Sequence, residues 1–248
     1  MLLAGQVAFV TGATGGIGSE ICRSLAKEGA DISICYHSKN EKAKMLYEEI
    51  TSMGRKALIV QADVSDKAQV FSAVEKTRQT LGPVDILVNN AGMTATGKLE
   101  DISEKDWDHC MAVNLKSVFL CSQAVIPEMK KREKGSIINI SSIAAKTGAT
   151  NASACYPVSK AAVSSLTLQT AKELLPFNVN VNGIAPGIID TPLWEVYGSE
   201  KKRESIKNVV RGAGSPIDVA EIVVFLASSK SRYITGEIID VNGGVFMD

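Results

Sequence analysis

Short apolar runs alternate with longer helical patterns along nearly all of this 248-residue chain. Fully apolar strands that are separated by helices are typical of a parallel sheet with both faces covered. The sequence therefore predicts one α/β domain over residues 1–248, a doubly wound parallel sheet with helices on both faces. The predicted strands lie in the segments QVAFVTG, ADISICY, KALIVQAD, VDILVNNAG, GSIINISS, NVNVNGIAPG and GEIIDVNGG.

Helical patterns fill the connections between most of these runs. The first passes through Ile21 and Leu25 and ends near Gly29, and the others lie near residues 40–53, 66–80, 104–130 and 157–175. Residues 187–214 break the regular alternation, because they are polar and charged with Trp194 and Tyr197 embedded. Such a segment often forms a lid in a doubly wound fold, so we predict a substrate lid there.

The composition excludes several classes of protein. The 27 basic and 27 acidic residues give a formal net charge of zero, which indicates no nucleic-acid or membrane-surface partner. No apolar run reaches the roughly 18 residues of a membrane span, and the first residues lead directly into a strand pattern rather than a signal peptide. The five cysteines are scattered and show no metal-ligand spacing. We therefore expect free thiols, no metal and a cytoplasmic location.

A glycine-rich segment, TGATGGIG at residues 11–18, joins the first predicted strand to the first helix. Glycines at such a junction allow a tight turn, and they let backbone N–H groups approach a phosphate closely. The spacing is Gly-x3-Gly-x-Gly, and a glycine-rich turn alone could be only a tight connection. Its position after the first strand of an α/β chain favours nucleotide binding.

Polar residues follow three further strands, at the edge where open α/β sheets bind ligands. Asp63 and Val64 follow the third strand, where the edge would meet an adenine. The segment NNAG at 89–92 follows the fourth strand, and Ser141 and Ser142 follow the fifth. Each segment could instead be an ordinary turn, because Asp, Asn and Gly all favour turns.

The segment ACYPVSKAAVSSL at 154–166 places Tyr156 and Lys160 four residues apart on a predicted helix. Pro157 fits the first turn of a helix, where its missing N–H costs nothing. Positions i and i+4 share a helix face, so both side chains can point into the same space. An ammonium group lowers the pKa of a nearby tyrosine, so such a pair could move a proton at neutral pH. The alternative is a pair of neighbours on the surface.

Asn114 lies within the apolar helix pattern WDHCMAVNLKSVFLCSQAV. An asparagine in the middle of a helix with apolar neighbours is unfavourable unless it has a hydrogen-bond partner. The partner could be structural or functional, and the pattern alone leaves both open.

Taken together, these features resemble the short-chain dehydrogenases/reductases. TGATGGIG, NNAG, Asn114, Ser142, YPVSK and PGIIDT occur in the order and spacing of that family, and the likeness extends to the closing YITGEIIDVNGG. Within the family, the chain is most similar to 3-oxoacyl-carrier-protein reductases and acetoacetyl-CoA reductases, and next to bacterial sugar dehydrogenases. The resemblance implies a Rossmann-type fold and an NAD(P)-dependent oxidoreductase that acts on CH–OH or C=O groups.

The resemblance also implies a role for each matching residue. Tyr156 would protonate the carbonyl oxygen, and Lys160 would lower the pKa of the tyrosine and hold the ribose. Ser142 would bind the substrate oxygen, and Asn114 would hold a water that links Lys160 to solvent. The turn Pro186–Gly187 would wrap the nicotinamide. The cofactor-binding set implied in this way is Thr11, Gly12, Gly16, Ile17, Gly18, His37, Ser38, Lys39, Asp63, Val64, Asn90, Ala91, Gly92, Tyr156, Lys160, Pro186, Gly187, Ile189 and Thr191.

The choice between the two nicotinamide cofactors depends on two positions. Relatives that use the phosphorylated cofactor often carry a basic residue at position 15, which here is Gly15. The second strand ends in CYHSKN, with no carboxylate before Glu41. A carboxylate there would bind the ribose 2′-hydroxyl and repel a 2′-phosphate. His37, Ser38 and Lys39 could meet a phosphate instead, so we predict NADP(H) as the preferred cofactor and NAD(H) as the alternative.

Three functions are compatible with this sequence. We predict NADPH-dependent reduction of a 3-oxoacyl thioester, carried by acyl-carrier protein or CoA, to the 3-hydroxyacyl thioester, as in fatty acid biosynthesis. The alternatives are an NAD(P)-dependent dehydrogenase of a sugar or another secondary alcohol, and a non-catalytic NADP(H)-binding redox sensor. The set Asn114, Ser142, Tyr156 and Lys160 argues against the sensor. It does not separate the two enzymes, because reductases and dehydrogenases use the same residues.

Two expectations concern partners. The family is usually tetrameric through the helices near 104–130 and 157–175, so we predict a homotetramer. The apolar residues Val118, Leu120, Val163 and Leu166 fit either its interface or the internal core. A carrier protein is acidic, so its docking site should be basic and close to the mouth of the active site.

Basic residues are available for such docking in EMKKREKG at 128–135. Arg132 matches a basic position of the carrier-protein reductases, whereas their second basic position falls on Phe177. The alternative is a solvated helix end, where positive charge is favoured anyway.

Two further residues need no catalytic role. We expect Cys155 to pack as a small residue rather than act as a nucleophile, and His109 to lie on a helix surface.

Overall fold

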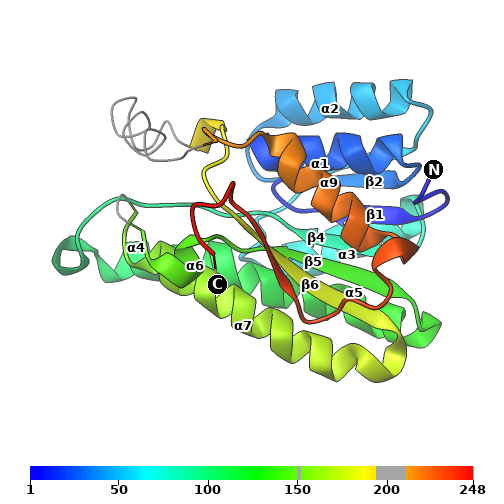
Figure 1. Ribbon diagram of the computed structural model, residues 1–248. Helices are drawn as coiled ribbons and strands as arrows, with labels where there is room; N and C mark the ends of the chain where they lie inside the picture. Colours follow the sequence, from blue (N-terminus) through cyan, green and yellow to red (C-terminus); the bar gives the residue numbers. More distant parts are fainter. Residues whose placement is uncertain (150–151, 194–210, 248) are drawn as a thin grey trace.

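The computed structural model describes residues 1–149, 152–193 and 211–247, which form a seven-stranded sheet. All six neighbouring strand pairs are parallel, and the strand order is β3-β2-β1-β4-β5-β6-β7 (Figure 1). The order reverses between β1 and β4, so the carboxyl ends of these two strands open a crevice for a ligand. The strands are β1 Val7–Val10, β2 Asp31–Tyr36, β3 Ala57–Gln61, β4 Ile86–Asn89, β5 Gly135–Ile140, β6 Val179–Pro186 and β7 Ile238–Val241. All seven predicted strands and the doubly wound fold class are confirmed.

Long helices cover both faces of the sheet (Figure 1). On one face lie α1 Gly16–Lys27, α2 Asn40–Ser52 and α9 Pro216–Ala227, and on the other lie α3 Lys67–Thr80, α5 Ser117–Arg132 and α7 Cys155–Leu174. Shorter helices are α4 Glu104–Met111 and α6 Ala144–Thr147, with 3₁₀ turns at Leu99–Asp101, Leu175–Phe177 and Ser229–Ser231. The helix α9 is absent from our sequence-based prediction.

Alternation along each strand divides the core into two layers. Ala8 and Val10 pack with the α1, α2 and α9 layer, whereas Phe9 packs with the layer of α3, α5 and α7. The apolar residues Val118, Leu120 and Val163 belong to the interior, with exposed fractions of 3, 2 and 0 %. Of the two roles left open for these three residues, the internal core is therefore the correct one.

The predicted helix near 104–130 is one helical run that a π-helical turn, Ala112–Lys116, divides into α4 and α5. By length and composition this run, Glu104–Arg132, is the one described helix that could cross a membrane. Its residues Cys121, Val125 and Met129 are buried against the sheet. We therefore interpret it as a core helix.

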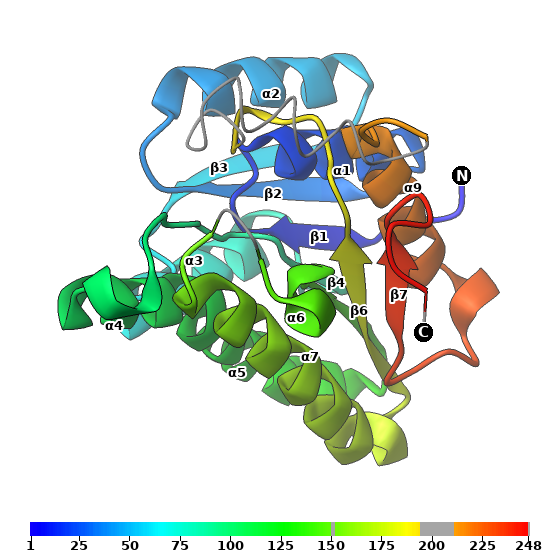
Figure 2. The same cartoon turned by 60° about the vertical axis from the view of Figure 1, so that its left-hand side comes forward.

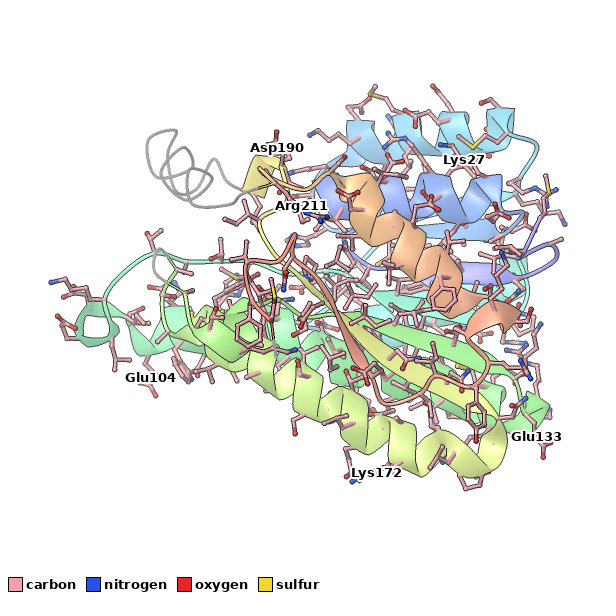
Figure 3. The ribbon with its side chains drawn as sticks, in the orientation of Figure 1. Lys27, Glu104, Glu133, Lys172, Asp190 and Arg211 are labelled. Carbon is pink, nitrogen blue, oxygen red and sulfur yellow. The ribbon has the colours of Figure 1, made fainter. Side chains whose placement is uncertain are left out.

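A cluster of charged side chains joins elements at the edge of the sheet where the strands begin, here called the amino edge. The buried Asp85, directly before β4, accepts the Val7 N–H at 3.0 Å and the Arg132 Nη1 at 2.7 Å. Arg132 also donates from Nη2 to the Val84 carbonyl at 2.7 Å, and Lys134 Nζ lies 3.2 Å from the Asp85 carboxylate. In Figure 3, Glu133 directly after α5 lies at the opposite end of the molecule from Asp190. Arg132 is thus at the edge opposite the crevice.

Candidate active site

Helix α7 carries the predicted tyrosine–lysine pair. It begins at Cys155, so Pro157 stands in its first turn, where a helix tolerates a proline. Tyr156 and Lys160 therefore lie one turn apart on the same face, and both line a cavity at the carboxyl edge of the sheet. Cys155 is fully buried, and its Sγ lies 2.8 Å from the Ser153 hydroxyl. Its burial agrees with the expectation that Cys155 packs as a small residue.

Lys160 is a buried cation beside the cavity. Its exposed fraction is 5 %, and its Nζ donates to the Ile140 carbonyl at 2.8 Å. Burial lowers the pKa of Lys160 from 10.5 to about 8, and the nearby Cys110 acts in the opposite direction. Lys160 is therefore still mostly protonated at neutral pH.

The two serines after β5 have different partners. Ser141 donates from its hydroxyl to the Lys160 carbonyl at 3.0 Å and lies 2.8 Å from the Ser164 hydroxyl, so it holds α7 against β5. The Ser142 Oγ instead accepts the Ala144 N–H at 3.1 Å. Since that bond uses an acceptor position of the hydroxyl, the Ser142 proton can be donated into the cavity.

Asn114 is fully buried in the π-helical turn. Its Oδ1 accepts the Met93 N–H at 2.8 Å, and its Nδ2 donates to the Met93 carbonyl and to the Ser159 hydroxyl, both at 3.0 Å. An ideal Cβ on Gly92 would lie 3.4 Å from both Asn114 Oδ1 and Lys160 Nζ. The two side chains therefore meet where Gly92 leaves room. The partner that Asn114 requires is the backbone of the segment after β4.

The glycine loop is packed against the NNAG segment. Gly12 has a φ of +61°, which favours glycine, and its carbonyl accepts the Asn90 Nδ2 at 3.1 Å. An ideal Cβ on Gly18 would collide with the Gly12 carbonyl and lie 2.6 Å from Asn90 Nδ2. Glycine is therefore required at 18 for α1 to start this close to β4. No acidic residue lies in the first turn of α1, so its N-terminus keeps its preference for an anion.

The end of β2 presents basic residues on the surface. His37, Ser38 and Lys39 are exposed and line the cavity, and Lys42 joins them from the first turn of α2. Glu41, the first carboxylate after β2, pairs with Lys44 at 3.0 Å and does not line the cavity. This part of the rim therefore offers positive charge and a hydroxyl to a ligand.

Asp63 lies at the same end of the cavity. A hydrogen bond from the Ser65 hydroxyl holds the pKa of Asp63 below its ordinary value, while burial opposes this shift and the nearby His37 and His109 support it. His109 is exposed on α4, as predicted from its helix pattern, but it also lines the cavity. Both histidines of the chain thus line the same cavity as this carboxylate and favour its charged form.

The cavity has a volume of about 1200 Å³, enough for a dinucleotide and a small substrate. The turn after β6 closes one side of it, because Gly187 donates its N–H to the Val241 carbonyl at 2.9 Å. An ideal Cβ on Gly16 would lie 2.8 Å from Thr191 Cγ2, so this turn also approaches the glycine loop closely.

Comparison with known proteins identifies the family. A family model of short chain dehydrogenases matches residues 6–202. The chain belongs to the short chain dehydrogenases. It is 38 % identical over 241 residues to the 3-oxoacyl-[acyl-carrier-protein] reductase FabG of Staphylococcus aureus, with 97 % of this chain and 98 % of the relative covered.

Two further similarities cover the whole short chain dehydrogenase fold. The FabG of Thermotoga maritima is 39 % identical over 249 residues, with 99 % of each chain covered. A solved structure of a blue fluorescent protein from a metagenomic library, in complex with NADPH, has a TM-score of 0.93 and 37 % identity and covers 100 % of both chains. The enzyme class predicted from the sequence, an oxidoreductase of this family, is confirmed.

The cavity of this short chain dehydrogenase brings together all but two of the predicted site residues. The exceptions are Asn114, described above, and Thr11. Thr11 is buried, and its Oγ1 accepts the N–H groups of Asn90 and Ala91, both at 3.0 Å. It positions the NNAG segment rather than lining the site. The residues that do line it are Gly12, Gly16, Ile17, Gly18, His37, Ser38, Lys39, Asp63, Val64, Asn90, Ala91, Gly92, Ser142, Tyr156, Lys160, Pro186, Gly187, Ile189 and Thr191.

Sequence reasoning missed several cavity residues. Thr14, a polar residue within the glycine loop, and Lys42 line the cavity, and so does the ion pair of Arg23 and Glu49, whose Nε and Oε2 lie 2.6 Å apart. Others carry no motif; among them are Met93, Val113, Ile143, Ala144, Thr147, Gly148, Ala149, Ala152, Ile188 and Leu193. Most of the predicted lid, with Trp194 and Tyr197, lies outside the described residues. Its ends pair, because the Asp190 N–H donates to the Gly214 carbonyl at 2.8 Å.

These residues fit a bound dinucleotide. The glycine loop has no room for a Cβ at Gly18, and the helix behind it starts without an acidic residue. The buried Lys160 donates one hydrogen bond to Ile140 and has further N–H groups available for hydroxyl groups in the cavity. Among the described residues, no cluster of three or more metal-ligating side chains occurs.

Proposed function

We propose that this protein uses NADPH to reduce the 3-oxo group of a 3-oxoacyl thioester. The balanced reaction is R–CO–CH₂–CO–SR′ + NADPH + H⁺ → R–CHOH–CH₂–CO–SR′ + NADP⁺. The observation that carries this proposal is the placement of Tyr156, Lys160 and Ser142 around one cavity that the glycine loop also enters. Relatives that carry the name 3-oxoacyl-[acyl-carrier-protein] reductase at 38 to 40 % identity support the substrate class.

Each residue has a separate task in this reaction. NADPH, when bound, supplies the hydride to the carbonyl carbon. Tyr156 donates its phenolic proton to the carbonyl oxygen, and the Lys160 cation favours the resulting phenolate. Ser142 donates its hydroxyl to the same oxygen and stabilises the charge that develops there. Asn114 fixes Met93 and, through Ser159, is connected to the Tyr156 carbonyl, which accepts the Ser159 hydroxyl at 2.7 Å.

The cofactor preference is supported by the end of β2. His37, Ser38 and Lys39 line the cavity there, while the nearest carboxylate in sequence, Glu41, is turned to Lys44. A 2′-phosphate there would meet Lys39 and the Ser38 hydroxyl, while Glu49, which also lines the cavity, is paired with Arg23 at 2.6 Å. The similar solved structure contains NADPH. We therefore propose NADPH over NADH, although position 15 is a glycine.

The wall around Tyr156 favours an acyl substrate over a sugar. Beyond the catalytic side chains, many of the described residues that line the cavity with Tyr156 are apolar or glycine, among them Met93, Ile143, Ala149 and Ile188, while Thr147 and His109 are polar. A sugar with several hydroxyl groups would leave its hydrogen bonds unpaired against such a wall. This wall therefore favours the thioester reductase over the sugar or alcohol dehydrogenase.

The test is a substrate panel that contains acetoacetyl-CoA, the matching acyl-carrier-protein thioester and a set of sugars, each with NADPH and NADH. We expect the highest kcat/KM for an acetoacetyl thioester with NADPH. Oxidation of a sugar by a protein that leaves both thioesters untouched would contradict the proposal. Cofactor binding without turnover of any substrate would instead favour a redox sensor.

Carrier-protein docking through Arg132 is not supported by this structure. The guanidinium pairs with Asp85 at 2.7 Å at the amino edge and does not line the cavity. The position of the second basic residue is Phe177, whose ring is covered by Lys130 Nζ at 4.6 Å. The choice between carrier protein and CoA is therefore tested on the wild type, by comparing kcat/KM for the two matched acetoacetyl thioesters at low and high salt. A preference for the carrier-protein thioester that shrinks as salt rises would indicate docking through charge.

We further propose a cytoplasmic homotetramer that pairs through α5 and α7. Three large apolar side chains on these helices, Phe119, Val158 and Leu168, are 48, 45 and 46 % exposed. They replace Val118, Leu120 and Val163 as interface candidates. Light scattering at micromolar concentration should give a tetrameric mass, and a monomeric mass would reject this assembly.

A further inference from the structure

One short segment, residues 143–149, contributes five residues to the lining of the cavity that Tyr156 also lines. It directly follows Ser142 and contains α6, a helix of four residues. A helix this short has few internal hydrogen bonds, so contacts with other elements must set its position. Figure 2 shows α6 near the ends of β6 and β7, close to the C-terminal segment.

The position of α6 controls the orientation of Ser142. The Ala144 N–H, in the first turn of α6, donates to Ser142 Oγ at 3.1 Å. The Ala145 N–H donates to the Ser142 carbonyl at 3.0 Å. With an acceptor position of the hydroxyl occupied in this way, its proton points elsewhere, and the cavity is the space beside it. A shift of α6 would therefore move the donor that faces the substrate.

Two contacts join the segment to the two neighbouring strands. The Ile143 N–H, directly before α6, donates to the Pro186 carbonyl at the end of β6 at 3.0 Å. The second contact is an ion pair of 2.8 Å between Lys146 Nζ on α6 and Asp240 Oδ2 on β7. Because Asp240 lies beside Ala185 of β6 in the sheet register, this ion pair reaches across β6. It ties α6 to the edge strand.

This ion pair is better protected than an ordinary surface pair. The Lys146 and Asp240 side chains are 25 and 21 % exposed, and the centroid of the Phe246 ring lies 5.5 Å from Lys146 Nζ. Asp240 Oδ1 is buried and has no hydrogen-bond partner among the described residues. The Asp240 charge therefore depends on Lys146, and partial burial strengthens their attraction.

We propose that Lys146 is a positioning residue for Ser142. Its ion pair with Asp240 holds α6, and α6 in turn holds the Ser142 hydroxyl in the orientation that donates to the reacting oxygen. The inference rests on the proposed function only in taking Ser142 as that donor. It concerns the chain's own residues and does not depend on which carbonyl compound is reduced.

Hydrogen–deuterium exchange tests the first half of the proposal without any substrate. In the ligand-free protein, Lys146→Met should speed exchange of the backbone amides of residues 143–148 by about five- to tenfold. Lys146→Arg keeps the charge and should restore the wild-type rate. Arg78→Met breaks an exposed pair with Glu75 on α3, away from the cavity, and serves as the matched control. Unchanged exchange in Lys146→Met would overturn the proposal.

A double-variant cycle with Ser142→Ala tests the second half. Lys146→Met should lower kcat roughly tenfold, since small displacements of a catalytic donor have effects of this order or larger. The cofactor Kd should stay within about twofold of wild type. In the Ser142→Ala background, the same Lys146 change should have no further effect on kcat, because its target hydroxyl is absent. Losses that multiply in the double variant would show that Lys146 acts in another way, and would overturn the proposal.

A third variant distinguishes two causes of a lower kcat in Lys146→Met: loss of the connection that positions α6, and the unpaired charge left on Asp240. Lys146→Met/Asp240→Leu removes both charges and still lacks the connection between α6 and β7, so its kcat should stay low. Full recovery would assign the effect to the unpaired Asp240 and contradict the proposal. Failure of the proposed function appears separately, as a wild type that leaves acetoacetyl thioesters untouched. The kinetic cycle is then run with the alcohol that the panel identifies, and the exchange test is unaffected.

Discussion

The two edges of the sheet hold their cations in different ways. At the amino edge, Arg132 and Lys134 converge on the Asp85 carboxylate, at 2.7 and 3.2 Å, and the charge is balanced within the chain. At the carboxyl edge, Lys160 is 5 % exposed, and no carboxylate pairs with it among the described residues. The first arrangement stabilises the fold, whereas the second costs stability and keeps a charge available to a ligand. Substitutions at the two edges should therefore affect different properties.

The largest effect is expected at the carboxyl edge, on chemistry alone. Tyr156→Phe should lower kcat by at least about 10²-fold, because it removes the proposed proton donor and keeps the ring. Cofactor binding and the thermal midpoint should stay close to those of wild type. Steady-state kinetics and a cofactor titration measure the two quantities. A phenylalanine variant with near wild-type turnover would exclude Tyr156 from the mechanism.

At the amino edge the effect should be on stability alone. Arg132→Met leaves the buried Asp85 with Lys134 as its remaining cation and should lower the free energy of unfolding by roughly 3 kcal/mol. The kcat of the folded fraction should not change. Urea unfolding and kinetics measure this pair of properties, with Lys131→Met as the control at an exposed neighbouring site. A stable variant with low turnover would reverse our assignment of the two edges.

Lys160→Met should lower activity and raise the free energy of unfolding. Burial lowers the pKa of Lys160 from 10.5 to about 8, so between these values the unfolded chain binds more protons and wild-type stability rises with pH. The variant, free of this cost, should be more stable by roughly 2 kcal/mol below pH 8, after allowance for the lost bond to Ile140. Its advantage should fall above pH 8, vanish at about pH 9.5 and become a deficit of roughly 1 kcal/mol near pH 10.5, where only the lost bond to Ile140 remains. An advantage that does not change with pH would show that burial of the charge is not its cause. Turnover and cofactor affinity should both decline.

The smallest effect is expected for Lys39, an exposed cation at the carboxyl edge. Lys39→Ala should narrow the ratio of the Michaelis constants for NADH and NADPH by about fivefold, equivalent to roughly 1 kcal/mol for an exposed charge pair. Lys27→Ala, at the far end of α1 in Figure 3, is the matched control. A wild type that itself prefers NADH would contradict the assignment of the residues after β2 to a 2′-phosphate.

The sequence alone predicted those features that local patterns encode. Apolar runs gave all seven strands, and fixed spacings gave the glycine loop and the pair Tyr156 and Lys160. The helix α9 was missed because PIDVAEIVVFLA is apolar on nearly all sides and so lacks a helical period, although Ser215 and Asp218 form a capping box at its start.

Contacts between distant residues were beyond such patterns. Arg132 is 47 positions from Asp85, so its commitment to the amino edge has no local signal. Ser141 and Ser142 are neighbours with the same local pattern; only the family resemblance selected Ser142, and the physical difference, that Ser141 is bonded to α7, is seen only in the structure. Asn114 was expected to need a partner, but nothing in its own helix identifies Met93 as that partner.

The two hydrogen bonds between Asn114 and Met93 replace strand pairing beyond the end of β4. The primary amide accepts the N–H and donates to the carbonyl of one residue, as a peptide group in an adjoining strand would do. Asn114 thus acts as a surrogate strand one residue long. It satisfies the N–H and the carbonyl of Met93, four residues beyond β4, without a further strand.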